Sequence, residues 1–384
     1  MLPRIATLAD AILCSMKITF ILPRLSARPT GGGKIVYQYA NALANIGHTV
    51  EVVHPRTLFL WGIRKTLPLK LLSLAADCAR FAAVRLTRGR VSVPWMPMHP
   101  NVKISVVPAL FPYFIPNADV VVASLWRTAE YVKHFPSSKG RKFYLVQHYE
   151  TWSGPVHRVD RTLKSTMHKI VISSWLKLLV VGLSGDEVHQ IPNPVDHDEF
   201  FVTTPVTNRQ RVVGMLYSPH AWKGATDGVA ALEQAKEEFP ELKAILFGTS
   251  ARPDFLPEWI TYVRSPDRKT LRDEIYNVSS IYVCPSWSEG WGLPVLEAMA
   301  CGCAIVSTDN GGTADFVVDG GNGIVVPPKR PRELGAALLS LLADDDRRTA
   351  LATRSIGLAQ RFTLEASVDK LLAALTDAPI AAKV

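Results

Sequence analysis

The chain has 384 residues, more than a single hydrophobic core usually supports, so two domains are expected. Its 48% hydrophobic and 20% charged residues are ordinary for a globular protein and argue against extensive disorder. No stretch offers the roughly 20 apolar residues that span a bilayer. Asp10 interrupts the apolar N-terminus, so the sequence does not predict a secretory signal either.

The cysteines, five in number, show neither a metal-ligand spacing with histidines nor an even disulfide framework. Cys301 and Cys303 lie too close in sequence for an ordinary disulfide, and we interpret them as small residues that pack. A reducing cytoplasm is the simplest compartment for this chain.

Residues 1–15 have no obvious place in the expected fold, and we interpret them as a non-native extension with Met16 as the natural start. A strand, a glycine-rich loop, a helix and a strand are then expected over residues 17–22, 30–33, 35–46 and 49–53. This order predicts a βαβ unit. It is not an ATPase phosphate loop, because Ile35 stands after Lys34, where Ser or Thr is required.

The net charge of +9 is concentrated in the first half of the chain. Between Arg56 and Arg90, further lysines and arginines are opposed only by Asp77 and are interleaved with leucine, phenylalanine and valine. This pattern is typical of a basic amphipathic helix that lies on anionic lipid headgroups. The alternative is a solvated helix that covers the N-terminal domain.

Four more strands of the first half are expected over residues 102–107, 120–123, 143–147 and 169–173. Because each is followed by a polar or helical stretch, they predict a parallel sheet with helices on both faces. Residues 191–196 form a turn-rich linker.

Strands and helices alternate again after the linker and predict a second doubly wound domain. Its strands are expected over residues 212–216, 244–247, 281–284 and 304–307. Helices are expected over residues 228–238, 269–277, 295–300, 333–342 and 364–376.

The most informative stretch is residues 288–302, where two carboxylates lie around a glycine-rich loop that opens a helix. Pro294 suits the first helical turn, and the glycines let the backbone approach a ligand closely. The N–H groups at such a helix start favour a phosphate. Glu289 and Glu297 could then meet the sugar and the ribose of a sugar diphosphate. From the residues alone, the alternative is a solvated Glu289 and a Glu297 that only decorates an amphipathic helix.

This stretch resembles the signature of the retaining GT-B glycosyltransferases of group 1, or family 4. That signature is close to S-E-G-F-G-L-P-x-L-E-A-M-A-C-G, and the chain matches it with Trp291 in the aromatic place. The resemblance implies that the first glutamate and the amides after it hold the donor sugar and diphosphate, and that the second glutamate holds the ribose. The implied donor-binding residues here are Glu289, Gly290, Trp291, Gly292, Leu293 and Glu297.

The resemblance also assigns Lys223, which follows the first strand of the second domain, to the donor diphosphate. A lysine there stabilises the leaving group as the glycosidic bond breaks. The chain departs from the family at Met215, where an arginine usually follows the glycine of the strand. One diphosphate-binding cation is therefore missing, or it is supplied elsewhere, with His220 and Arg264 as candidates.

Residues of the first domain are expected to complete the site. Gly32 and Gly33 take the role of a loop close to the donor diphosphate and the acceptor. His148 follows an expected strand, where the family often has a histidine that assists the reaction, and Glu150 could instead orient or deprotonate the acceptor hydroxyl. The predicted catalytic residues are Glu289, Lys223 and His148.

The expected fold is α/β: a GT-B architecture of two Rossmann-like domains facing a cleft, with a C-terminal helix that crosses back to the first domain. The expected parts are an extension, an acceptor-side domain, a nucleotide-sugar-binding domain and the crossing helix, over residues 1–15, 16–195, 196–358 and 359–384. Because the Asp-x-Asp motif of the GT-A type is absent from the sequence, no metal or other cofactor is implied.

The function implied is transfer of a hexosyl unit, with retained configuration, from a nucleotide-sugar to a hydroxyl acceptor in lipid-linked or polysaccharide glycan synthesis. A sugar-nucleotide epimerase, a phosphorylase and a non-catalytic nucleotide-sugar-binding module are the alternatives. The expected partners are a nucleotide-diphosphate sugar, a glycan or lipid-linked acceptor and, through residues 56–90, an anionic membrane surface, but not nucleic acid. The expected location is cytoplasmic, or peripheral on the inner face of the cell membrane, and UDP, GDP and dTDP are all open as the donor nucleotide.

Overall fold

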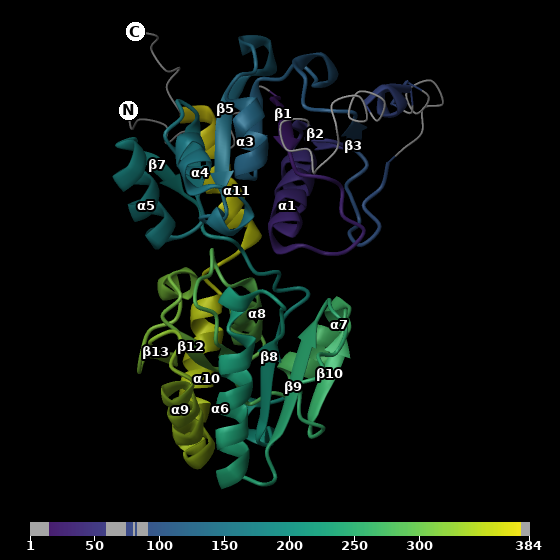
Figure 1. Ribbon diagram of the computed structural model, residues 1–384. Coiled ribbons are helices and arrows are strands. Elements are labelled where there is room, and N and C mark those ends of the chain that lie inside the picture. Colours follow the sequence, from purple (N-terminus) through teal and green to yellow (C-terminus); the bar gives the residue numbers. More distant parts are fainter. Residues whose placement is uncertain (1–14, 59–73, 80, 83–90, 378–384) are drawn as a thin grey trace, which may run out of the picture. The chain divides into compact units, whose positions relative to one another are not determined.

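The computed structural model describes residues 15–58, 74–79, 81–82 and 91–377 (Figure 1). Two compact units divide the chain: unit 1 is Met1–Ile170, Val180–His189 and Leu371–Val384, and unit 2 is Val171–Leu179 and Gln190–Lys370. Residues 1–14 of the expected N-terminal extension, and most of the predicted basic helix, fall outside the described residues. In the part of the chain that is described, no helix has the length and apolarity needed to cross a bilayer.

Unit 1 is built on a seven-stranded sheet in the order β3-β2-β1-β4-β5-β6-β7. Its strands are β1 (Lys17–Ile21), β2 (Thr49–Pro55), β3 (Val102–Val107), β4 (Val120–Ala123), β5 (Arg141–Val146), β6 (His168–Val171) and β7 (Val188–Gln190). Its helices are α1 (Gly31–Asn45), α3 (Trp126–Val132) and α4 (Val156–Leu163), and α5 (Ser174–Ser184) is divided between the two units. The central strand β1 pairs in parallel with both β2 and β4. A parallel pair needs a crossover connection, and helix α1 provides the one from β1 to β2.

The central strands are apolar on both faces because helices cover both sides of the sheet. All four residues of β4 and the last four of β1 are buried. Such strands have continuous apolar sequences, which is why they could be recognised from sequence.

The glycines that were predicted as a loop form the first turn of α1 instead, so that prediction is wrong. Thr30, with an extended backbone, is the N-cap, and the helix begins at Gly31. The lack of a side chain at Gly32 is used for packing: a Cβ atom there would lie 3.0 Å from Nε2 of Gln147. Glycine therefore serves close packing at the helix start.

Unit 2 is built on a six-stranded sheet in the order β10-β9-β8-β11-β12-β13, and all its pairings are parallel. Its strands are β8 (Val212–Leu216), β9 (Lys243–Gly248), β10 (Ile260–Arg264), β11 (Ile281–Cys284), β12 (Ala304–Thr308) and β13 (Gly323–Val326). Its helices are α6 (Ala225–Glu238), α7 (Arg268–Thr270), α8 (Leu293–Ala300), α9 (Pro331–Ala343) and α10 (Asp345–Ala359). A π-helical turn over Leu271–Tyr276 follows α7, where an α-helix was predicted.

The last helix, α11 (Leu364–Asp377), begins in unit 2 and ends in unit 1, because the division falls between Lys370 and Leu371. Within unit 1, Arg141 donates hydrogen bonds from its guanidinium to the carbonyl oxygens of Leu375 and Thr376. Leu375 is fully buried. The end of α11 is therefore a packed part of unit 1.

Candidate functional site

The centre of the unit 2 sheet is a topological switch point. Strands β8 and β11 are neighbours there, and the chain leaves them toward opposite sides, from β8 to β9 and from β11 to β12. Open α/β sheets bind ligands at such a point, just beyond the carboxyl ends of the strands. The loops after β8 and β11 carry Lys223 and Glu289.

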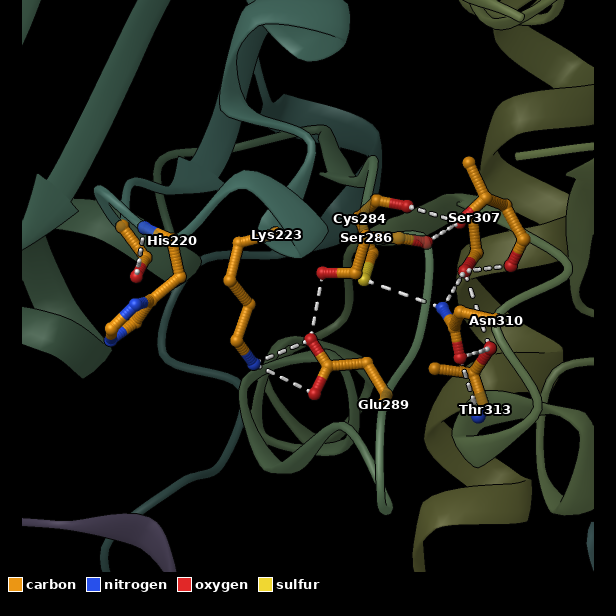
Figure 2. Close-up of polar contacts among 10 residues, drawn as sticks. His220, Lys223, Cys284, Ser286, Glu289, Ser307, Asn310 and Thr313 are labelled. Atoms are coloured by element: carbon orange, nitrogen blue, oxygen red, sulfur yellow. Dashed lines mark hydrogen bonds and ion pairs between the residues drawn. The ribbon is translucent and has the colours of Figure 1, made fainter. Parts of the chain in front are cut away.

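The structure brings these two side chains together. The ammonium nitrogen of Lys223 donates to Oε1 and Oε2 of Glu289 at 2.7 and 2.8 Å (Figure 2). Ser286 donates its hydroxyl to Oε1 of the same carboxylate at 2.7 Å. The side chain of Glu289 is 11% exposed and that of Lys223 is 24% exposed, so the pair is largely buried but is still in contact with solvent.

The position of Lys223 depends on the turn that follows it. Gly224 has a left-handed backbone with φ 61°, and a Cβ atom there would overlap the carbonyl oxygen of Pro285. The backbone N–H of Trp287 also donates to the carbonyl oxygen of Trp222 at 2.7 Å. The two loops therefore touch through their backbones, and only glycine fits at position 224.

The loop after β12 contacts the backbone of Glu289. The backbone N–H of Glu289 donates to the carbonyl oxygen of Asn310 at 3.0 Å. The side-chain oxygen of Asn310 accepts from the backbone N–H of Thr313, and its amide donates to the hydroxyl of Ser307 at 3.2 Å (Figure 2). Gly312 packs directly on the backbone of Glu289, because a Cβ atom at Gly312 would lie 2.7 Å from that carbonyl oxygen.

The start of α8 lies immediately after Glu289. Gly292 is the N-cap, in a left-handed conformation with φ 96°, and Pro294 lies in the first turn. Among the described residues, no group accepts a hydrogen bond from the backbone N–H groups of Gly290, Trp291, Gly292 and Leu293. Such donors at a helix start carry a partial positive charge and form an anion site.

The side chain of Trp291 is packed among other aromatic rings of unit 2. Its side chain is 2% exposed, with ring centroids 4.9 Å from Phe316 and 5.5 Å from Phe362. The indole therefore anchors the loop in an aromatic cluster, and an aromatic ring at this position of the motif has a packing reason.

Glu297, the second glutamate, lies on α8 and is 7% exposed. Its Oε2 accepts a hydrogen bond from the hydroxyl of Tyr276 at 3.1 Å. Sequence reasoning missed Tyr276, which lies within a predicted helix and has no neighbouring signal of a polar role.

Of the proposed replacement cations, His220 stacks on Trp222 with ring centroids 4.4 Å apart, and Arg264 is exposed at the carboxyl end of β10. Met215 is fully buried within β8, with its thioether against Gly228 of α6. A side chain at that position faces the core of unit 2.

The candidate residues of unit 1 form a group of their own. The carbonyl oxygen of Gly32 accepts from the side-chain amide of Gln147 at 3.2 Å, so the start of α1 adjoins the end of β5. Gly33, the next residue of α1, lies against Thr30 and Trp95. The ring of His148 meets that of Trp152 edge-on at 4.4 Å.

Glu150 is 6% exposed, and its Oε2 accepts from the backbone N–H of Trp126, the first residue of α3, at 2.9 Å. Burial raises the pKa of this carboxyl group to about 8, against the hydrogen bond and the charge of Arg127, which lower it. Glu150 is therefore mostly protonated at neutral pH, in a position that caps α3. Within the described residues, no cluster of His, Cys, Asp and Glu is arranged to hold a metal ion.

The two units, each built on a doubly wound parallel sheet, have the GT-B fold. Solved structures share this fold over most of the chain. Sucrose-phosphate synthase from Thermosynechococcus elongatus is 18% identical, with a TM-score of 0.67 and coverage of 92% of this chain and 97% of that one. HepE from Anabaena, in complex with UDP-glucose, is 17% identical, with a TM-score of 0.69 and coverage of 94% and 100%.

Residues 196–356 match the protein family described as glycosyl transferases group 1. The D-inositol 3-phosphate glycosyltransferase of Rhodococcus jostii is 34% identical over 125 residues, 33% of this chain and 26% of that protein. That of Xylanimonas cellulosilytica is 30% identical over 208 residues, 47% of this chain and 49% of that protein. The matches thus span about a quarter to a half of these relatives. The part of unit 2 that carries Glu289 and Glu297 is therefore similar to the group 1 glycosyltransferases.

Proposed function

We propose that the protein transfers a hexosyl unit from a nucleotide-sugar donor to a hydroxyl acceptor with retention of configuration. The observation that carries this proposal is the Lys223–Glu289 pair beside the start of α8, at the switch point of unit 2. A cation, a row of backbone N–H groups and a carboxylate match the parts of a sugar diphosphate in order.

In the proposed reaction, the bond between the anomeric carbon and the diphosphate oxygen breaks, and the nucleoside diphosphate leaves. The acceptor oxygen bonds to the anomeric carbon on the same face, and its proton passes to the departing phosphate oxygen. Lys223 and the N–H groups at the start of α8 stabilise the negative charge that develops on the diphosphate. Glu289 orients the sugar hydroxyls, Glu297 holds the ribose, and His148 assists at the sugar.

UDP is the first nucleotide to test. HepE was solved with UDP-glucose and TarM from S. aureus with UDP, and both share the fold at 17% and 10% identity. Calorimetric titration of UDP, GDP and dTDP into the protein, followed by nucleotide release from the matching sugar donors, tests the proposal. An α-linked product from an α-linked donor, seen by NMR, supports retention. Failure to bind any of the three nucleotides would overturn the proposed function.

We also propose that the reaction needs no metal ion, because Lys223 and the helix start supply positive charge where the diphosphate is placed. Turnover should then survive dialysis against EDTA. A loss of turnover that Mg²⁺ or Mn²⁺ restores would contradict this proposal.

The proposed acceptor is a lipid-linked or polysaccharide glycan precursor, reached at the inner face of the cell membrane. Unit 1 holds 24 Lys and Arg against 10 Asp and Glu, whereas unit 2 holds 19 against 24. A concavity of about 620 Å³ in unit 1 is lined by Lys133, Arg161 and Lys164, with Asp160 as the carboxylate among its lining residues. Such a charge distribution favours anionic lipid surfaces.

Flotation with vesicles of phosphatidylglycerol and of phosphatidylcholine tests this membrane proposal. The wild type should float with the anionic vesicles, and a variant carrying Arg161→Gln and Lys164→Gln should float less. Equal flotation of the wild type with both lipids would contradict it.

A further inference from the structure

Tyr276 has a hydroxyl group that is aimed at one atom of the proposed ribose-binding residue. The hydroxyl donates to Oε2 of Glu297 at 3.1 Å, and the tyrosine side chain is fully buried. A buried hydroxyl without a partner costs free energy, and a phenylalanine would fill nearly the same space. The carboxylate of Glu297 therefore gives this position a reason to be tyrosine.

The ring of Tyr276 is held on three sides by other aromatic rings. Its centroid lies 5.9 Å from that of Phe200, 5.8 Å from that of Phe247 and 5.7 Å from that of Tyr282. Burial, and next to it the negative charge of Glu297, raise the pKa of Tyr276 well above its ordinary value. The hydroxyl therefore keeps its proton, and stays a hydrogen-bond donor, throughout the neutral range.

The backbone at Tyr276 is fixed as well. Tyr276 is the last residue of the π-helical turn. The N–H of Asn277 donates a hydrogen bond to the carbonyl oxygen of Arg272, five residues earlier, as is typical of a π-helix. The buried guanidinium of Arg209 donates to the carbonyl oxygen of Tyr276 at 3.3 Å. The side-chain amide of Asn277 donates to the carbonyl oxygen of Arg272 at 2.9 Å. Backbone and ring together leave the hydroxyl little freedom of direction.

We propose that Tyr276 is a positioning residue that orients the Glu297 carboxylate for the two ribose hydroxyls of the donor. This inference rests on the proposed function. A carboxylate that is held at Oε2 cannot rotate freely, so Oε1 stays in the plane where a pair of neighbouring hydroxyls can donate to it. Tyr276 would thus favour ribonucleotides through Glu297, without touching the donor.

The test is the affinity of Tyr276→Phe for UDP compared with 2′-deoxy-UDP and 3′-deoxy-UDP, measured by calorimetry; GDP and its deoxy forms replace them if GDP binds the wild type more tightly. The wild type should prefer the ribonucleotide. The affinity of the variant should fall roughly tenfold for the ribonucleotide and far less for the deoxy forms. Only the ribonucleotide has both hydroxyls that the oriented Glu297 carboxylate accepts, so only its binding depends on the hydrogen bond from Tyr276. Equal losses for all three nucleotides, or no loss, would overturn the proposal.

Tyr282→Phe is the matched control. Tyr282 is 1% exposed and belongs to the same aromatic cluster, on β11. Its variant should leave the preference for the ribonucleotide unchanged, because the hydrogen bond to Glu297 stays. If it weakens the preference as much as Tyr276→Phe does, the effect belongs to the packing of the cluster and the proposal fails.

Glu297→Asp keeps the tyrosine in place and keeps the inference testable if Tyr276→Phe does not fold. The shorter side chain withdraws the carboxylate from the hydroxyl, so the preference for the ribonucleotide should fall. Full preference in this variant would contradict the inference. If the wild type binds no nucleoside diphosphate, the proposed function itself is overturned. If the wild type and the Tyr276→Phe variant both bind and prefer the ribonucleotide equally, only the role of Tyr276 is overturned.

Discussion

The ammonium group of Lys223 lies against both carboxylate oxygens of Glu289, at 2.7 and 2.8 Å, although the two residues are 66 positions apart. The carboxylate is thereby oriented, and the lysine is held beside the loop that leads into α8. When a diphosphate binds, the ammonium group can donate some of its hydrogen bonds to the phosphate oxygens. The pair therefore links the sugar-binding and the phosphate-binding parts of the proposed site.

Lys223→Ala should lower kcat/KM for the nucleotide-sugar by about 100-fold or more, because one preorganised charge at the leaving group is lost. Steady-state nucleotide release measures this effect. Lys243→Ala is the control, because it removes the same charge at the exposed start of β9, whereas the site loops follow the ends of the strands. It should leave kcat/KM near the wild-type value. Near wild-type turnover in Lys223→Ala would remove the lysine from the mechanism.

Gly224→Ala should destabilise the protein by about 2 kcal/mol or more and weaken donor binding, because the new methyl group meets the carbonyl oxygen of Pro285 in a left-handed turn. Gly320→Ala is the control. Gly320 has a similar φ of 68°, compared with 61° at Gly224, but a Cβ atom there meets nothing within 4 Å. Urea unfolding should show a clearly smaller loss for Gly320→Ala. Equal losses would show that backbone strain, rather than loop contact, sets the cost.

Trp291→Phe should leave nucleotide affinity within about twofold of the wild type, because only the backbone of residue 291 faces the proposed diphosphate. Its buried indole nitrogen makes no hydrogen bond within the described residues, so the ring change costs mainly packing. Trp291→Ala should instead destabilise the protein by about 3 to 5 kcal/mol, since it empties the cluster with Phe316 and Phe362. Calorimetry and urea unfolding separate the two effects. A large loss of affinity in a stable Trp291→Phe variant would assign the side chain to the donor.

Four strands were predicted with the bounds that they have: residues 102–107, 120–123, 212–216 and 281–284. The strands over 120–123 and 281–284 are buried throughout, and such strands are continuous apolar runs. Strands β7, β10 and β13 were not predicted. Helix α10 (Asp345–Ala359) was not predicted, because its first half is charged and its apolar positions are few. The π-helical turn could not be predicted either, since it depends on tertiary contacts of Arg209 and Asn277.

The approach of Lys223 to Glu289 could be anticipated, because both follow strands that a doubly wound order places side by side. The burial of Met215 was missed, because counting from the strand glycine ignored which side chains reach the edge of the sheet. The capping of α3 by Glu150 was also missed, since it depends on a contact between segments 24 residues apart.

The buried carboxyl group of Glu150 should make the stability of the protein depend on pH. Its pKa is about 8 in the folded chain and close to 4.5 when the chain unfolds. Between these values the folded state binds one more proton than the unfolded state, so rising pH favours unfolding. This contribution is fully present below pH 4.5 and is lost as the pH rises through about 8, with an upper bound of about 5 kcal/mol.

Glu150→Gln removes the titrating group and keeps an oxygen for the N–H of Trp126. Urea unfolding at pH 5, 6.5 and 8 should therefore show the variant gaining stability relative to the wild type as the pH rises, by about 3 kcal/mol across this range. Glu333→Gln, at an exposed carboxylate in the first turn of α9, should give a curve parallel to that of the wild type. Parallel curves for Glu150→Gln as well would mean that Glu150 is ionised in the folded protein. In that case its carboxylate, rather than its acid form, would cap α3, and a role as a base toward the acceptor would be favoured instead.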